Sequence, residues 1–206
     1  DFALGLGVDY VALSFVQRPE DVQEAKDIAK GRAWIMTKLE KPQAMERLSD
    51  IIALSDAVMV ARGDLGVELP AEAVPIEQKR AIREARFQGK PVIVATQMLE
   101  SMITSPTPTR AEVSDVSNAV FDGTDAVMLS AESAAGKYPR EAVEVMARVT
   151  RRVENDLEWR MQEEALRPDS DGTTGGSIAE AAWHVAQSVS AAVIVVYTQS
   201  GRGALQ

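Results

Sequence analysis

The sequence contains no cysteine, which excludes disulfide bonds and thiolate metal ligands. It has one histidine, His184, and no histidine follows a predicted strand, so a zinc site is not expected. No apolar run approaches the roughly 18 residues of a membrane-spanning helix, and the first residues lack the basic start of a signal peptide. Together these absences favour a reducing compartment, and we expect a cytoplasmic protein without a membrane partner.

Positive charge is also scarce. The 22 lysine and arginine residues are outnumbered by 31 aspartate and glutamate residues, which gives a net charge of −9. Broad nucleic-acid binding needs clustered cations, so we expect no nucleic-acid partner. A phosphorylated small molecule is still compatible with this charge, since a few local cations or a bound metal can override the global field.

Short apolar runs alternate with stretches of helical period. Six runs have the length and β-branched content of buried strands, namely Tyr10–Val16, Ala33–Leu39, Ala57–Ala61, Val92–Thr96, Ala126–Ser130 and Ala192–Thr198. Predicted helices cover Pro19–Ala29, Pro42–Leu54 and Ala71–Phe87, and others begin at a capping box at Thr109–Glu112, at Pro139 and at a second capping box at Ser177–Glu180. This alternation predicts a parallel α/β sheet.

Polar residues lie at the carboxyl ends of five successive predicted strands. They are Ser14, Lys38, Arg62, Thr96 and Ser130, and they recur at the spacing of single βα units. Carboxyl ends of parallel strands converge in a (β/α) barrel, whereas a doubly wound sheet brings fewer of them into one pocket. We therefore predict a partial (β/α)8 TIM barrel of five βα units, with the other three strands upstream.

Three segments are predicted along the chain. Residues 1–166 form the barrel units, and residues 167–176 form a linker because they are rich in Gly, Ser, Thr, Asp and Pro. Residues 177–206 begin a C-terminal α/β domain.

Two carboxylates stand out at the ends of neighbouring strands. Lys38 and Glu40 are alternate residues and should project into the same space. Asp64 follows the next strand, after Gly63, which leaves room for a ligand near the backbone, and before Gly66, which is expected to open a turn. Glu40 and Asp64 would form an oxygen site suited to Mg²⁺ or Mn²⁺. An ordinary salt bridge is the alternative for Lys38 and Glu40.

Two further groups carry weaker signals. The Thr96 hydroxyl, at the end of its strand, could position a substrate or a water, although a strand-end threonine is more often only a cap. Ser130 and Glu132 are expected to share a strand face, where they could relay a proton or serve a structural role.

Longer segments carry a family resemblance. Met59–Pro70 (MVARGDLGVELP) resembles the metal and substrate segment of pyruvate kinases. Two segments resemble the next strand and the following helix of that family, namely Gly89–Met102 (GKPVIVATQMLESM) and Pro106–Val116 (PTPTRAEVSDV). Its last barrel strand and the loop after it are similar to Asp122–Ser130 (DGTDAVMLS) and Glu132–Pro139. Thr37–Glu40 corresponds to the Lys-Ile-Glu of the family. These segments occur in the family's order and cover nearly the whole chain up to the linker. Residues 177–206 look like the start of its C-terminal domain.

The resemblance implies phosphoryl transfer from phosphoenolpyruvate to ADP, giving pyruvate and ATP in glycolysis. It implies that Lys38 stabilises charge on the phosphoryl group and the enolate, and that Glu40 and Asp64 hold a divalent metal. The substrate site is implied to consist of Lys38, Arg62, Gly63, Asp64 and Thr96. It also implies K⁺, whose ligands lie outside these residues, and a homo-oligomer, a tetramer in the family.

Ser130 and Glu132 are implied to lie on the proton route to the enolate carbon. The chain departs from the family where Lys41 replaces the usual Asn after Glu40, and where Ala131–Ser133 replaces Gly-Glu-Thr. Because several of the family's elements fall outside the 206 residues, this chain alone is expected to be inactive.

Two other functions remain as alternatives. The first is a metal-dependent aldolase or lyase acting on pyruvate enolate, since such barrels also place Glu and Asp on adjacent strand ends. The second is a non-catalytic, self-associating barrel fragment, because an incomplete barrel exposes strand edges and core.

Overall fold

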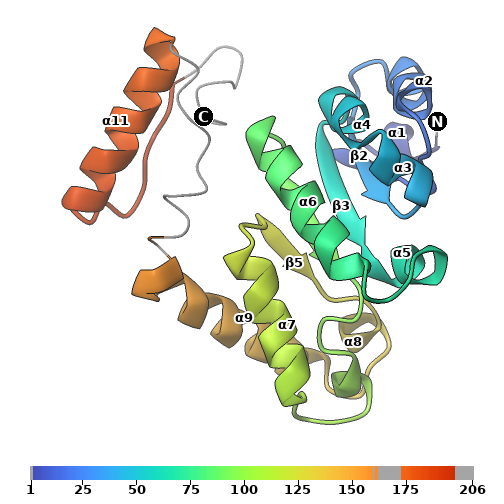
Figure 1. Cartoon of the computed structure of the whole chain (residues 1–206), viewed down its shortest axis with the longest axis vertical. Helices are drawn as coiled ribbons and strands as arrows, with labels where there is room; N and C mark the ends of the chain where they lie inside the picture. Colours follow the sequence, from blue (N-terminus) through green and yellow to red (C-terminus); the bar gives the residue numbers. More distant parts are fainter. Residues whose placement is uncertain (1, 160, 162–172, 198–206) are drawn as a thin grey trace. The chain divides into compact units, whose positions relative to one another are not determined.

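Five parallel strands form one sheet in the order β1-β2-β3-β4-β5 (Figure 1). The strands are β1 (Tyr10–Leu13), β2 (Trp34–Leu39), β3 (Ala57–Ala61), β4 (Val92–Ala95) and β5 (Ala126–Met128). The computed structural model describes residues 2–159, 161 and 173–197, and the chain divides into two units, residues 1–166 and 167–206. Sequence order equals spatial order, so each strand lies beside the next, which confirms the predicted partial barrel of five βα units.

The helices of the first unit connect these strands. They are α1 (Phe2–Gly5), α2 (Pro19–Ala29), α3 (Pro42–Glu46), α4 (Leu48–Leu54), α5 (Arg62–Glu68), α6 (Val74–Phe87), the 3-10 helix η1 (Glu100–Ile103), α7 (Arg110–Phe121), α8 (Ala131–Ala134) and α9 (Pro139–Glu154). Figure 1 shows α6 against β3 and α7 against β5, and α2 contacts β2. The predicted capping box is confirmed, because the Thr109 hydroxyl accepts the Glu112 N–H.

The hydrophobic core lies between the sheet and these helices. Alternate residues of β2, Ile35, Thr37 and Leu39, are buried, while Met36 and Lys38 on the opposite face are half-buried. Every residue of the central strand β3 is buried. The polar Thr37 is satisfied by the Ser55 hydroxyl, with 2.6 Å between the two side-chain oxygens. The face opposite the helices is therefore the one that leaves polar side chains accessible.

A repeated tetrapeptide, Asp-Ala-Val-Met, begins both β3 and β5. The Asp56 carboxylate accepts the Ile35 N–H at 2.8 Å, and the Asp56 N–H donates to the Ile35 carbonyl. Asp125 makes the same two contacts with Val92. Each aspartate thus fixes the register of its strand against the preceding strand in the sheet, and so the relative positions of the opposite strand ends.

Several predicted boundaries in the first unit are wrong. The strand expected over Tyr10–Val16 ends at Leu13, and the helix expected over Ala71–Phe87 begins at Val74. Gly66 does not open a turn, because residues 62–68 continue as helix α5. The strand expected over Ala126–Ser130 ends at Met128. The helix expected over Pro42–Leu54 is broken at Arg47, whose backbone leaves the helical region.

The second unit contains α11 (Thr174–Ser188). This helix begins before the predicted capping box at Ser177, because the Thr173 hydroxyl accepts the Gly176 N–H and caps it earlier. The strand predicted over Ala192–Thr198 is wrong for the described residues 192–197, which form no strand, and Tyr197 is 96% exposed. A strand needs a neighbour to satisfy its backbone, and none is present in the described part of this unit. Among the described residues, no helix has the length and apolar character to cross a membrane.

Candidate active site

Lys38 and Glu40 lie together at the carboxyl end of β2, as predicted. The Lys38 ammonium is 2.5 Å from Glu40 Oε1 and donates to the Ser14 hydroxyl at 3.0 Å. Glu40 is fully buried, and its second oxygen, Oε2, accepts the Phe15 N–H at 2.7 Å. The end of β1 therefore orients both side chains. Phe15 was missed from the sequence because it acts through its backbone, which has a positive φ of 58°.

The carboxylates of Glu40 and Asp64 follow the neighbouring strands β2 and β3. Glu40 Oε1 is buried and is paired with the Lys38 ammonium. Asp64 lies in the first turn of α5, directly after the neighbouring strand, and is exposed. No group of three or more carboxylate or imidazole side chains forms in the described part of the chain. One or two carboxylates, with water and ligand oxygens, are a common arrangement for Mg²⁺.

Lys41, which departs from the family pattern, bridges two loops beside this site. Its ammonium is 2.6 Å from Glu68 Oε1 on α5 and 5.3 Å from the centre of the Phe15 ring. The lysine thus joins the loop after β1 to the helix that carries Asp64. Where the family usually has Asn, this chain therefore has a lysine that contacts two parts of the site.

Thr96 follows β4 in an unusual conformation. Thr96 and Gln97 both have positive φ, 69° and 54°, in the left-handed region that a β-branched residue rarely adopts. The Thr96 hydroxyl accepts the Gly63 N–H at 2.7 Å and donates to the Ala95 carbonyl at 2.6 Å. A Cβ added at Gly63 would lie 3.5 Å from the Thr96 hydroxyl oxygen, an ordinary contact. The start of α5 and the loop after β4 are therefore joined through this threonine.

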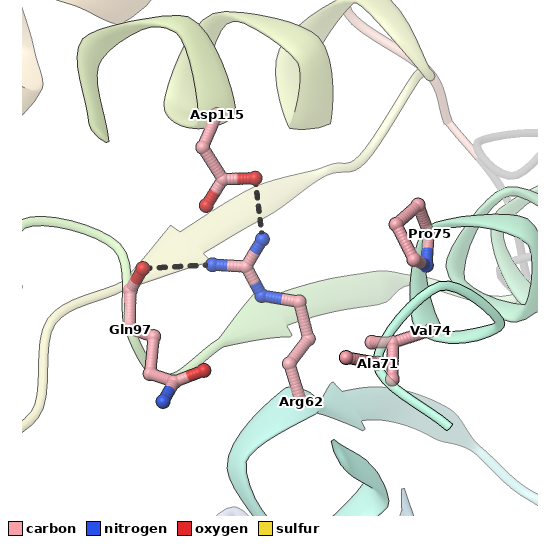
Figure 2. Close-up of a pocket in the computed structure, with 6 residues that line it drawn as sticks. All are labelled: Arg62, Ala71, Val74, Pro75, Gln97 and Asp115. Carbon is pink, nitrogen blue, oxygen red and sulfur yellow. Dashed lines mark hydrogen bonds and ion pairs between the residues drawn. The ribbon is translucent and has the colours of Figure 1, made fainter. Parts of the chain in front are cut away.

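Arg62 is buried, and Figure 2 shows its guanidinium between Asp115 and the Gln97 carbonyl. The distance from Arg62 Nη1 to Asp115 Oδ1 is 2.7 Å, and that from Nη2 to the Thr96 carbonyl is also 2.7 Å. A cavity of about 200 Å³ lies beside these groups, lined by Arg62, Ala71, Val74, Pro75, Gln97 and Asp115. This lining does not include Lys38, Glu40 or Asp64, so the cavity is not the predicted metal site.

Ser130 and Glu132 contact each other, but not through a strand face as predicted. Ser130 is the N-cap of α8, and its N–H donates to Glu132 Oε2 at 2.7 Å. Glu132 is 3% exposed, and its other oxygen accepts the Leu99 N–H at 3.1 Å. The carboxylate therefore joins the loops after β4 and β5.

Glu112 organises the segment that follows Thr96. Its carboxylate accepts the Ser101 N–H and hydroxyl, each at 2.6 Å, and the Thr109 N–H at 2.7 Å. Burial raises the pKa of Glu112, but the hydrogen bonds from Ser101 and Thr109 outweigh it, so the pKa lies below the ordinary value of 4.5. The capping box predicted Glu112 as a cap; its contact with Ser101 had no sequence signal.

Comparison with known proteins gives consistent matches. The family model described as pyruvate kinase, barrel domain, matches residues 1–143. A pyruvate kinase of Methylorubrum extorquens is 57% identical over 204 residues, which cover 98% of this chain and 42% of that protein. A Mycobacterium tuberculosis pyruvate kinase is 52% identical over 205 residues, with 97% and 42% covered. This chain therefore spans less than half the length of these relatives.

A solved structure agrees with the sequence matches. The crystal structure of a pyruvate kinase from Cryptosporidium parvum superposes with a TM-score of 0.91 at 40% sequence identity. The match covers 99% of this chain and 44% of that one.

Proposed function

Because this chain belongs to the pyruvate kinase family, we propose that the full-length protein transfers the phosphoryl group of phosphoenolpyruvate to ADP, giving pyruvate and ATP. The observation that carries the proposal is the buried Glu40 carboxylate 2.5 Å from the Lys38 ammonium, at the carboxyl end of a barrel strand. Ends of barrel strands are where the chemistry of this fold is performed. Phosphoryl transfer depends mainly on positioning and electrostatic stabilisation, which such a pair can supply.

Lys38 is proposed to stabilise the transition state. Its ammonium is held by Glu40 and by the Ser14 hydroxyl, so little reorganisation is needed when negative charge develops. Positive charge placed here would stabilise the equatorial oxygens of the transferring group and the enolate that it leaves. The buried carboxylate beside it keeps the ammonium oriented.

Glu40 and Asp64 are proposed to hold Mg²⁺ or Mn²⁺. The buried Glu40 carboxylate and the exposed Asp64 carboxylate, which follow neighbouring strands, support this assignment. When bound, the ion supplies positive charge to the oxygens of the phosphoryl group and of pyruvate. Lys41 and Glu68 would limit movement of α5, and hence of Asp64, relative to Glu40.

The carboxylate of phosphoenolpyruvate is proposed to bind at the start of α5, at the backbone of Gly63 and Asp64 and at Thr96. The first turn of a helix leaves backbone N–H groups without partners inside the helix, and the hydrogen bond from the Gly63 N–H holds the Thr96 hydroxyl against this helix start. Ser130 and Glu132 are proposed to lie on the proton route to the enolate carbon. The contact of Glu132 with the Ser130 N–H supports a role in placing that serine.

Further properties are proposed on the family relationship. They are a K⁺ requirement, with ligands outside this chain, assembly of identical subunits into a tetramer, and a place in glycolysis in the cytoplasm. We also propose that turnover needs the remainder of the full-length protein.

The experiment is to supply the full-length protein with Mg²⁺, K⁺, phosphoenolpyruvate and ADP, and to couple pyruvate formation to lactate dehydrogenase. We expect oxidation of NADH that depends on ADP. A parallel incubation with a 4-hydroxy-2-oxo acid tests the aldolase alternative. Cleavage of that acid without ADP-dependent use of phosphoenolpyruvate would overturn the proposal in favour of the aldolase.

A further inference from the structure

The guanidinium of Arg62 is fully engaged by protein groups. A guanidinium has five N–H bonds. The Nε donates to the Thr96 carbonyl at 3.2 Å, and Nη1 contacts Asp115 at 2.7 Å and Gln78 at 3.5 Å. The Nη2 group meets the carbonyls of Thr96 and Gln97 at 2.7 and 3.2 Å and the Met98 sulfur at 2.8 Å. These contacts leave the arginine no donor with which to bind a substrate.

The backbone carbonyls that Arg62 binds belong to one strained turn. Thr96 and Gln97 are consecutive left-handed residues, and this region is disfavoured for residues with a Cβ, above all for a β-branched threonine. Such a conformation persists only where its surroundings fix it. The two carbonyls of this turn meet on the same Nη2 of Arg62. A buried cation is thus bonded to the carbonyl groups whose direction the strained φ values set.

Neighbouring groups hold the same turn from other sides. The Gly63 N–H donates to the Thr96 hydroxyl, so residues 62 and 63 bind both the carbonyl and the side chain of Thr96. Glu132 accepts the Leu99 N–H and fixes the far end of the segment. Asp115, on α7, holds Nη1 of the arginine (Figure 2).

We propose that Arg62 is a positioning residue, which holds the Thr96–Gln97 turn in its left-handed conformation and so fixes the Thr96 side chain against the start of α5, where the substrate carboxylate is proposed to bind. It replaces the direct substrate contact expected for Arg62 from the sequence. The inference rests on the proposed function for the identity of the substrate, but its structural part does not.

The test uses the full-length protein and a rescue. Arg62→Met should raise the KM for phosphoenolpyruvate by about tenfold or more, with a smaller change in kcat, because uniform binding is lost. It should also lower the thermal midpoint. Gln97→Gly added to Arg62→Met should restore part of both, since glycine adopts a positive φ without strain. The Gln97→Gly single variant shows what this substitution does by itself to the KM and the thermal midpoint. The matched control is Arg80→Met, at an exposed arginine on α6, which should change neither the KM nor the midpoint.

The outcomes separate the two roles of Arg62. If Gln97→Gly restores neither the KM nor the midpoint in the Arg62→Met background, the positioning role is overturned. An Arg62→Met protein with an unchanged KM and midpoint overturns it as well. If Arg62→Met does not fold, the same comparison is made with Arg62→Lys and its Gln97→Gly double variant. If the unaltered protein does not use phosphoenolpyruvate and ADP, the proposed function fails. The thermal midpoints then still test whether Arg62 holds the Thr96–Gln97 turn.

Discussion

The Gly63 amide donates to the Thr96 hydroxyl over 2.7 Å, although the two residues follow different strands. This bond connects the start of α5 to the loop after β4, the two segments at which the substrate carboxylate is proposed to bind. A threonine at the end of a strand could have been only a cap. In this structure its hydroxyl uses one bond for its own strand end, at Ala95, and accepts one from the adjacent loop.

Replacing Thr96 by valine keeps the shape of the side chain and removes both hydrogen bonds. We expect a loss of about 1–2 kcal/mol in the free energy of unfolding and a rise in the KM for phosphoenolpyruvate. Thr96→Ser, which keeps the hydroxyl, should stay near the unaltered protein in both quantities. Urea unfolding and steady-state kinetics measure the free energy of unfolding and the KM. Equal values for the valine and serine variants would mean that the Thr96 hydroxyl contributes to neither.

Metal binding should depend on both carboxylates. In the full-length protein, Glu40→Gln and Asp64→Asn should each weaken Mn²⁺ binding by about tenfold or more, since each removes a charged oxygen ligand. Free Mn²⁺ is measured by electron paramagnetic resonance during a titration. Asp50→Asn, the same change at an exposed aspartate on α4, is the control and should leave the affinity unchanged. An unaltered affinity in Asp64→Asn would mean that Asp64 is not a ligand.

The contribution of Glu112 to stability should depend on pH. Because its pKa is lowered by folding, its hydrogen bonds stabilise the folded state fully above the ordinary value of 4.5, and this contribution is lost as pH falls through the folded pKa. Glu112→Gln should therefore cost about 1–2 kcal/mol at pH 7. The difference from the unaltered protein should shrink below pH 4.5. Urea unfolding from pH 7 to 3.5 measures it, and a difference independent of pH would contradict the ionised cap.

Features governed by local periodicity could be predicted from the sequence. The strand order follows from alternating apolar runs, and the contact between Lys38 and Glu40 follows from the two-residue repeat of a strand. The capping box at Thr109 is equally local. The predicted strand over residues 192–198 is wrong where the structure describes it, because composition specifies an apolar run and a strand also needs a neighbour.

Contacts between distant segments could not be predicted in the same way. The acceptors of Arg62 lie 16 to 53 positions away, and two of them are backbone carbonyls that leave no sequence signal. The Phe15 amide that donates to Glu40 also leaves no signal in the sequence. A turn is predicted to open at Gly66, but α5 begins immediately after β3 and contains both Asp64 and Gly66.

The central claim is that the site built around Lys38 and Glu40 performs phosphoryl transfer. The most direct measurement is ³¹P nuclear magnetic resonance of the full-length protein with Mg²⁺, K⁺, phosphoenolpyruvate and ADP, compared with its Lys38→Met variant. If the site transfers the phosphoryl group, we expect equimolar loss of phosphoenolpyruvate and gain of ATP in the unaltered protein. We also expect a rate on the order of 100-fold or more lower in the variant, since an oriented charge at the transition state is removed. Equal rates in the two proteins, or no ATP from the unaltered one, would contradict the claim.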